Sequence, residues 1–218
     1  KTFEYEYDLD PAALTRRIIE TESERGIRDS MLLRAFAALM PRQVAAYLYR
    51  PVLSFFWDYP PPRDIGYLYW TDSSGHRMAF CGASDGTAHS CLAIMEEKTG
   101  VWQRVWSQEV PIGLPMLAVD TLHLGVESGG SPTLIARSSE MPDLNDDNFL
   151  IGWNGERARM LLGEPLKGRL VGRDLDGDDV LEVYGEFIDG ASDTWRRGVV
   201  YKYDPGDSLY HPVPDSTD

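Results

Sequence analysis

Short stretches in which apolar and polar residues alternate recur along most of the chain, and glycine-containing turn pairs separate them. A period of two residues is typical of a strand with one buried face, and such turn pairs are typical of antiparallel connections. From residue 65 onwards the pattern therefore predicts an antiparallel all-β structure. The predicted strands are residues 65–71, 77–81, 90–96, 101–107, 117–126, 133–138, 149–153, 158–162, 169–173, 180–187, 198–203 and 209–213.

The first 50 or so residues follow a different pattern. Residues 3–7 alternate aromatic with acidic side chains and predict one strand. Asp10 followed by proline predicts a helix start, and a second helix is expected from Asp29 or Ser30 to Met40. The helical part is thus confined to the beginning of the chain.

Three consecutive prolines at residues 60–62 interrupt the chain, because proline donates no backbone hydrogen bond and favours extended structure. They mark the boundary between a segment of strand and helices, residues 1–58, and a β-rich repeat domain, residues 59–218. We expect the two to pack as one unit.

An acidic turn that leads into an apolar strand recurs at intervals of about 50 residues, near residues 72, 127 and 174. Units of this length with about four strands each match the blades of β-propellers. The fold class expected is mainly β with an N-terminal helical segment, arranged as a partial or small β-propeller-like array of about three four-stranded antiparallel units. The alternative is that the repeat is a chance similarity.

The charge balance narrows the choice of partners. The chain has 35 acidic and 21 basic residues and a net charge of −14. A nucleic-acid partner is not expected, because a phosphate-binding surface needs clustered Lys and Arg. A protein partner, in particular a basic one, is favoured by electrostatic steering. The alternative is that the acidic surface serves solubility alone.

No uninterrupted apolar run approaches the roughly 20 residues that a membrane span needs. The sequence begins at Lys1 without methionine, which fits either a removed leader or a shortened chain. With the cysteines described next, this favours a periplasmic or secreted location.

The two cysteines, Cys81 and Cys91, flank an Asp-Gly turn signal at residues 85–86. A hairpin there places them on neighbouring strands, and a disulfide between them would indicate an oxidising compartment. The alternative is two buried thiols.

The most specific motif is the acidic segment at residues 174–182, which reads Asp-Leu-Asp-Gly-Asp-Asp-Val-Leu-Glu. Carboxylates at alternate positions converge when the backbone curls around one point, and Ca²⁺ accepts six to eight oxygens in flexible geometry. Without a cation, four carboxylates this close would repel one another. The sequence therefore predicts calcium here, and a solvated acidic turn is the alternative.

Residues 174–183 resemble the Asp-rich loop of FG-GAP and VCBS repeats, the calcium-binding blades of integrin-type β-propellers, and residues 168–212 resemble the repeat more loosely. The resemblance implies side-chain ligation by Asp174, Asp176, Asp178 and Glu182 and a carbonyl ligand from Val180. One departure concerns Asp179, where the family usually has glycine, so affinity for calcium is expected to be reduced.

No catalytic motif is recognisable: the chain lacks a Gly-x-Ser-x-Gly elbow, a phosphate loop, a dinucleotide fingerprint and a His-Glu-x-x-His sequence. Catalytic residues are therefore not assigned. The expected function is a non-enzymatic extracytoplasmic binding protein with a structural calcium site, in a protein-protein interaction or an inhibitor or immunity-type role. The alternatives are a carbohydrate-binding module that uses surface aromatics such as Trp70 and Trp102, and an unrecognised hydrolase. Trp102 and Trp106 are expected to share one face of a strand and to pack in the core.

Overall fold

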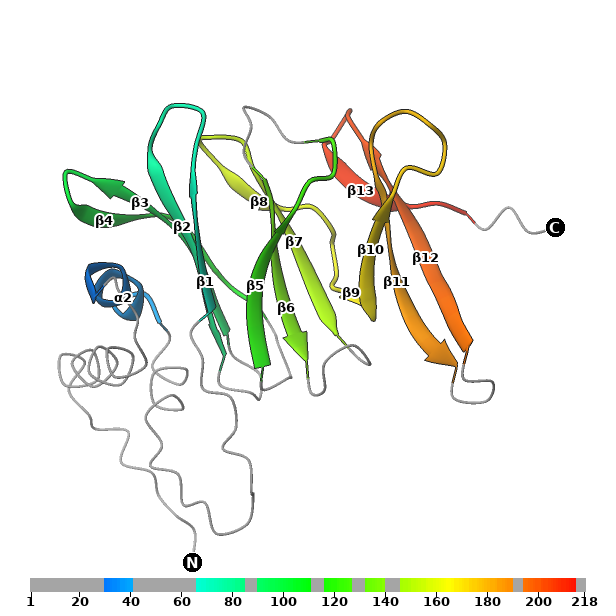
Figure 1. The fold of residues 1–218 in the computed structure, drawn as a ribbon, viewed down its shortest axis with the longest axis horizontal. Coiled ribbons are helices and arrows are strands. Elements are labelled where there is room, and N and C mark those ends of the chain that lie inside the picture. The colour runs from blue at the N-terminus through cyan, green and yellow to red at the C-terminus, as the bar shows by residue number, and fades with distance from the viewer. Residues whose placement is uncertain are drawn as a thin grey trace, which may run out of the picture.

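The computed structural model describes residues 30–40, 66–84, 90–110, 116–126, 132–139, 146–189 and 194–214. Within these ranges the strands form three antiparallel sheets, and none of them closes into a barrel. The sheets follow one another along the chain and stand side by side in Figure 1. The expected array of about three four-stranded antiparallel units is confirmed.

Sheet 1 contains β1 to β4 in sequential order. Its central strands β2 and β3 are buried on both faces, apart from their ends, which explains why they read as near-continuous apolar runs. The bounds are β1 Gly66–Thr71, β2 Arg77–Ser84, β3 Ser90–Lys98 and β4 Val101–Glu109.

Sheet 2 contains β5 to β8 in sequential order, and β9 also pairs with β7. The sequence pattern did not predict β9, because two residues are too few to show a period. The bounds are β5 Met116–Leu122, β6 Thr133–Ser139, β7 Asp147–Trp153, β8 Ala158–Met160 and β9 Leu166–Lys167.

Sheet 3 contains β10 to β13, again in sequential order. It corresponds to the unit that carries the acidic motif. The bounds are β10 Arg169–Arg173, β11 Glu182–Asp189, β12 Thr194–Asp204 and β13 Leu209–Pro212.

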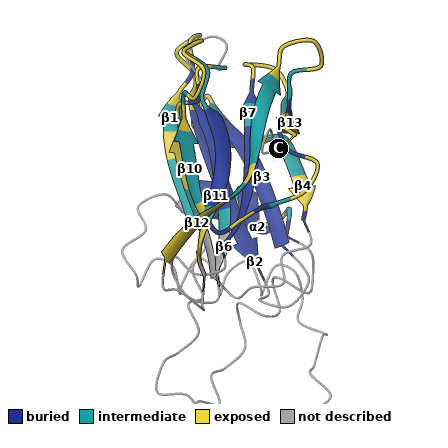
Figure 2. Ribbon diagram, turned by 90° about the vertical axis from the view of Figure 1, so that its right-hand side faces the viewer, coloured by how far each residue is buried: buried dark blue, intermediate teal, exposed yellow. Residues whose placement is uncertain are grey.

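In the described part of the chain, three hydrophobic clusters join these layers. The first packs helix α2, Ser30–Ala37, on one face of sheet 1, with Phe36 fully buried. The second lies between sheets 1 and 2 and contains Phe80 and Phe149, and the third lies between sheets 2 and 3 and contains Leu150 and Val183. Figure 2 shows the buried β2, β3 and β11 inside the stack, while exposed residues gather on β4 and β12.

Helix α2 confirms the second predicted helix, although it ends at Ala37 rather than at Met40. The predicted N-terminal strand and the first helix lie outside the described residues. No helix in the described ranges is long and apolar enough to cross a membrane.

The two tryptophans of β4 do not share a face. Trp102 packs in the cluster under α2, whereas Trp106 packs against the cluster between sheets 1 and 2. The pairing of β3 with β4 shifts between Ile94, which faces Trp106, and Met95, which faces Arg104. This β-bulge inserts one extra residue into β4. Beyond the bulge, each side chain of β4 therefore points to the face opposite to the one expected for a regular strand. The predicted core role is confirmed for Trp102, and the expected common face is wrong.

The predicted disulfide is also wrong: Cys81 and Cys91 are buried thiols. The predicted hairpin does place them on the neighbouring strands β2 and β3, but Cys81 pairs with Ala93 and Cys91 with Ala83. The cysteines are therefore diagonal neighbours, a relation that separates residues by about 7–8 Å. A disulfide normally needs a Cα separation below about 7 Å.

Candidate functional site

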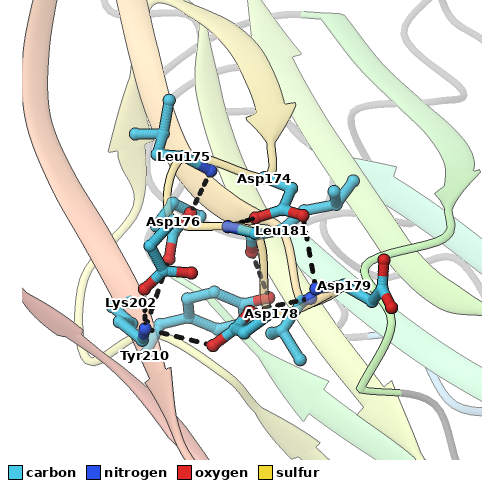
Figure 3. Close-up of polar contacts among 11 residues, drawn as sticks. Asp174, Leu175, Asp176, Asp178, Asp179, Leu181, Lys202 and Tyr210 are labelled. Carbon is cyan, nitrogen blue, oxygen red and sulfur yellow. Dashed lines mark hydrogen bonds and ion pairs between the residues drawn. The ribbon is translucent and has the colours of Figure 1, made fainter.

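The acidic motif forms the loop between β10 and β11, shown in Figure 3. Gly177 has φ 82° and Asp179 has φ 64°, so the chain passes twice through the left-handed region. Glycine adopts this region without cost, and aspartate tolerates it better than most residues. The loop thus turns tightly, as expected for Gly177, and Asp179 occupies a conformation that suits glycine.

Two aspartates hold the loop in its curled shape. Asp174 accepts hydrogen bonds from the backbone N–H of Gly177 at 2.6 Å and of Asp179 at 3.3 Å. Asp178 accepts from the N–H of Val180 at 2.9 Å. These bonds satisfy loop amides that no neighbouring strand reaches, and each carboxylate keeps lone pairs for another partner.

Glu182 closes the loop at its far end. It is the first residue of β11 and is only 3% exposed. Its Oε2 accepts the N–H of Leu175 at 2.7 Å, which ties the end of the loop to its beginning. A buried carboxylate needs such compensation because desolvation disfavours its charge.

The folded loop brings together three of the four carboxylates predicted as ligands. Oxygens of Asp174, Asp176 and Glu182 all lie within 4.8 Å of one another. A donor set made only of oxygens is what Ca²⁺ prefers, so the residues present fit such an ion. The assignment of Asp178 and of the Val180 carbonyl as further ligands stays a prediction.

A lysine that the sequence did not point to contacts one side of this group. The Lys202 ammonium, from β12, forms ion pairs with Asp176 and with Asp178, the latter at 3.1 Å, and lies 3.8 Å from Glu182 Oε1. Figure 3 shows it bridging the two aspartates. The pairing of Val183 with Tyr201 places position 202 across from position 182. Only the strand register could have revealed this contact, since 20 residues separate the two positions.

The charges of the group alter its pKa values. Hydrogen bonds to Asp176 and then to Asp178 hold the pKa of Lys202 above its usual value. The backbone N–H of Val180, followed by Lys202, holds the pKa of Asp178 below its usual value. The repulsion that motivated a cation is thus partly balanced by a lysine, which pairs with two of the carboxylates that were predicted as calcium ligands.

The loop is anchored to the rest of the fold at Leu181. Its N–H donates to the carbonyl of Leu124 at 2.8 Å, and its carbonyl accepts from the Tyr210 hydroxyl at 2.9 Å. A Cβ on Gly125 would lie 2.3 Å from the Asp179 carbonyl oxygen, so the segment after β5 approaches the loop very closely. The shape of the loop is therefore coupled to the contact between sheets 2 and 3.

A second group that the sequence did not predict lies around the β12–β13 turn, with Asp204 at the end of β12 and His211 in β13. Ligand atoms of Asp204, Asp207 and His211 come within 4.8 Å of one another, and all three residues are exposed. His211 Nε2 lies 2.8 Å from Asp207 Oδ2. Exposed acidic groups of this kind are common on protein surfaces, and no role is assigned to them.

The aromatic residues considered for carbohydrate binding lie mostly inside the protein. Trp102 is 5% exposed, and Trp70 is half-buried against the cluster between sheets 1 and 2. Tyr69 is exposed, and the Arg77 guanidinium covers its ring at 4.8 Å from the centroid. A flat stacking platform made of Trp70 and Trp102 is therefore not formed.

Comparison of the chain with models of known protein families gives no match, and comparison with curated proteins gives none either. The similarity of residues 174–183 to FG-GAP and VCBS repeats thus rests on the loop sequence itself.

Proposed function

We propose that the protein is a non-enzymatic binding protein whose loop at residues 174–182 holds a calcium ion. The observation that carries this proposal is the convergence of carboxylate oxygens from Asp174, Asp176 and Glu182 within 4.8 Å. The ion would compete with the Lys202 ammonium for Asp176 and Glu182. Its role would be structural, because the loop is bonded to Leu124 and Tyr210 at the contact between two sheets.

The same features support a periplasmic or secreted location. Asp176 and Asp178 are exposed, and the Lys202 ammonium would compete with calcium for their carboxylates. Both properties weaken calcium binding. Weak sites are filled where calcium reaches about 10⁻⁴–10⁻³ M, as outside cells.

A protein partner is supported by one face of sheet 3. Trp195, 46% exposed, pairs in register with Ile188, 38% exposed, and the Arg169 guanidinium lies 4.7 Å from the Trp195 ring centroid. Tryptophan and arginine dominate the binding energy of many interfaces. The net charge of −14 would steer a basic partner towards the molecule. An inhibitor or immunity-type role agrees with this combination.

Calorimetric titration with calcium, combined with thermal melts in calcium and in chelator, tests the site. The parent protein, the double variant Asp176→Asn with Asp178→Asn, and Lys202→Gln are compared. If the loop binds calcium, the double variant loses binding. Lys202→Gln then binds more tightly than the parent, because its competing cation is gone.

An absence of calcium binding would also be informative about the loop. If neither the parent nor Lys202→Gln binds calcium, and Lys202→Gln melts at a lower temperature, then lysine is the only cation that the loop uses. The calcium proposal then fails.

The partner proposal needs a separate test. Capture of a basic protein from an extracytoplasmic fraction should be lost with Trp195→Ala. Val101→Ala on β4, which removes a similarly exposed apolar side chain from sheet 1, should leave capture unchanged. Equal capture by both variants contradicts the assignment of this face.

A further inference from the structure

One edge of sheet 3 is only partly covered by its neighbouring strand. β12 runs over 11 residues, Thr194–Asp204, whereas β13 pairs only with the last four of them. The N–H of Val213 donates to the carbonyl of Val200 at 2.7 Å, and Pro214 then has no N–H to continue the ladder. Among the described strands, none pairs with residues 194–199 on this side. In Figure 1, β13 accordingly lies beside only the upper part of β12.

An edge of this kind can accept another strand. Alternate residues of an antiparallel strand direct their N–H and C=O groups to opposite sides, so residues 194–199 present backbone groups on the side away from β11. An extended peptide can bond to such groups by adding one strand to the sheet. Residues 194–197 are all exposed, and Val199 is 56% exposed. The edge is therefore accessible to a strand from another molecule.

Exposed apolar side chains gather beside this edge. Of the nine large apolar residues that are exposed in the described ranges, four lie at this end of β11 and β12: Phe187, Ile188, Trp195 and Val199. Natural proteins usually keep such residues away from open edges, because they promote pairing with unrelated chains. Their concentration here indicates a surface that a partner covers.

Two side chains beside the open edge point to the outer face of sheet 3, the face away from sheet 2. Val183 packs in the core shared with sheet 2, so the next residue, Tyr184, lies on the outer face. The Arg197 guanidinium lies 5.8 Å from the Tyr184 ring centroid and is therefore on the outer face as well. Trp195 is two residues before Arg197 in the same strand and shares this face.

The strand register arranges these side chains in rows that end at the open edge. In one row Ile188 pairs with Trp195, so an added strand would place a side chain beside an indole ring. In the other row Arg169 of β10 pairs with Glu186 of β11, which pairs with Arg197 of β12. This row alternates basic, acidic and basic. An acidic residue on an added strand would continue the alternation, because opposite charges directly across two strands attract.

The arginines of this edge also decide which strands are excluded. Charged residues and β-bulges commonly protect an edge from pairing, and β12 has both. A second copy of the chain, paired antiparallel through the same segment, would bring Arg196 and Arg197 of both copies together, and like charges across two strands are destabilising. An acidic strand is attracted by the same charges. The edge is thus selective for the chemistry of the strand that it accepts.

We propose that residues 194–199 of β12 bind an extended segment of a partner protein as an additional strand, with an apolar side chain beside Trp195 and an acidic side chain beside Arg197. The two recognised residues are two positions apart, because both side chains must lie on one face of the added strand. The proposal rests on the protein-binding role proposed above and names what is recognised. A partner that is basic as a whole fits it, because net charge steers over long distances whereas this pair acts in contact.

The test is fluorescence anisotropy with a labelled peptide, Thr-Val-Thr-Glu-Thr-Val-Thr, in which valine and glutamate are two positions apart in either strand direction. The matched peptide has lysine in place of glutamate. We expect the glutamate peptide to bind the parent protein saturably, with a dissociation constant below about 1 mM. The lysine peptide should bind about 5-fold more weakly, because it places two positive charges opposite each other.

Charge-reversed protein variants identify the contact. Arg197→Glu should reverse the preference, so that the lysine peptide binds about 5-fold more tightly than the glutamate peptide. Arg104→Glu on β4 makes the same change in net charge in sheet 1, and should leave the preference of the parent protein within about 2-fold. Trp195→Ala should weaken the binding of both peptides. The melting temperature of each variant shows whether it is folded.

N-methylated peptides show whether backbone hydrogen bonds carry the binding. One version of the glutamate peptide is methylated on the nitrogens of the two threonines next to glutamate, and the other on the nitrogens of the two valines. Only alternate N–H groups of an added strand face its neighbour. One version should therefore bind about 10-fold more weakly than the unmethylated peptide, while the other binds within about 3-fold of it.

Several results would overturn the proposal. The two peptides could bind the parent protein equally, Arg197→Glu could leave the preference unchanged, or both methylated versions could bind as the unmethylated peptide does. A dimer of the parent protein in sedimentation that Trp195→Ala dissociates would make a second copy the occupant, and would also overturn it.

The protein-binding role is judged separately, by the capture experiment. If Trp195→Ala loses a captured protein but the parent does not bind the glutamate peptide, the partner docks on this face without adding a strand, and only the strand proposal fails. If the peptides behave as expected but no basic protein is captured, the strand site stands and the basic partner proposed above fails.

Discussion

Single side chains decide the electrostatics of the acidic loop. The repulsion among its carboxylates is real, but its relief has two possible sources: an external ion or the Lys202 ammonium from β12. Lysine is a tethered cation that loses little translational freedom when it binds. Calcium carries twice the charge and can contact more oxygens at once. The affinity of this loop for calcium is therefore set as much by Lys202 as by the aspartates.

The lowered pKa of Asp178 makes a prediction about acid stability. The Val180 N–H and Lys202 favour its charged form in the folded protein. Such a group contributes stability that is present above the unfolded pKa of about 3.9 and is lost as pH falls through the lower, folded pKa. In chelator, the parent should therefore exceed Asp178→Asn in urea midpoint at neutral pH, and the difference should shrink as pH falls below about 4.

Lys202→Gln serves as the companion variant in this experiment. It removes one of the causes of the lowered pKa of Asp178, so the pH-dependent difference in urea midpoint caused by Asp178→Asn should be smaller when Lys202 is also replaced. If the difference in urea midpoint between the parent and Asp178→Asn stays constant from neutral to acid pH, the lowered pKa of Asp178 is contradicted.

The buried cysteines give a second prediction at this scale. Burial, and after it the charge of Glu109, raise the pKa of Cys91 to about 12. Its Sγ lies 3.7 Å from the Leu39 carbonyl, under helix α2, and Cys81 is fully buried. Because the thiolate is the reactive form, native protein should react negligibly with a thiol reagent at neutral pH, and two thiols should titrate after unfolding without reductant. No titratable thiol after unfolding would indicate a disulfide instead.

At the scale of strands, the sequence pattern was informative because turns and periodicity are local. Turn pairs and alternating residues located the strands β1 to β8 and β10 to β13. The loop geometry was also foreseeable, since Gly177 and Glu182 act within one short segment.

What the sequence did not reveal depends on register between distant segments. The bulge that separates Trp102 from Trp106 is a property of the β3–β4 pairing. The diagonal offset of Cys81 and Cys91 is a property of the β2–β3 pairing, and the contact of Lys202 with the loop depends on β11 meeting β12. A shift by one residue would change each of these outcomes without changing the local pattern.

The close contact between β9 and β11 leads to a prediction about stability. Gly185 lies in β11 at the irregularity in its pairing with β12, and a Cβ there would lie 1.7 Å from the Lys167 carbonyl oxygen of β9. Gly185→Ala forces two backbones apart, so we expect a loss of about 3 kcal/mol or more in the free energy of unfolding, measured in urea. Gly163→Ala is the control, because a Cβ there meets nothing within 4 Å, and its effect should stay within about 0.5 kcal/mol.

At the scale of the whole molecule, the sheets are linked by shared cores rather than by the chain alone. The cluster between sheets 1 and 2 takes Phe80 from one and Phe149 from the other. The cluster between sheets 2 and 3 combines Leu150 with Val183, and Leu124 in the connection after β5 also belongs to it. Arrays of repeated units gain stability mainly from such contacts between neighbours. If sheet 1 or sheet 3 separated from sheet 2, the apolar side chains of their shared core would become exposed to water.

This arrangement predicts that the three sheets unfold together. Tryptophan occurs in each of them, with Trp102 in sheet 1, Trp153 in sheet 2 and Trp195 in sheet 3. In protein labelled with 5-fluorotryptophan, the native ¹⁹F resonances of these three among the six tryptophans should disappear at the same urea concentration. Val183→Ala should lower that midpoint for all three signals alike, because it removes contacts from a core that the sheets share, at a cost of about 1–3 kcal/mol. If the Trp195 signal is lost first and Val183→Ala affects it alone, sheet 3 unfolds as a separate unit. The loop at residues 174–182 would then depend on a contact that opens before the rest of the fold.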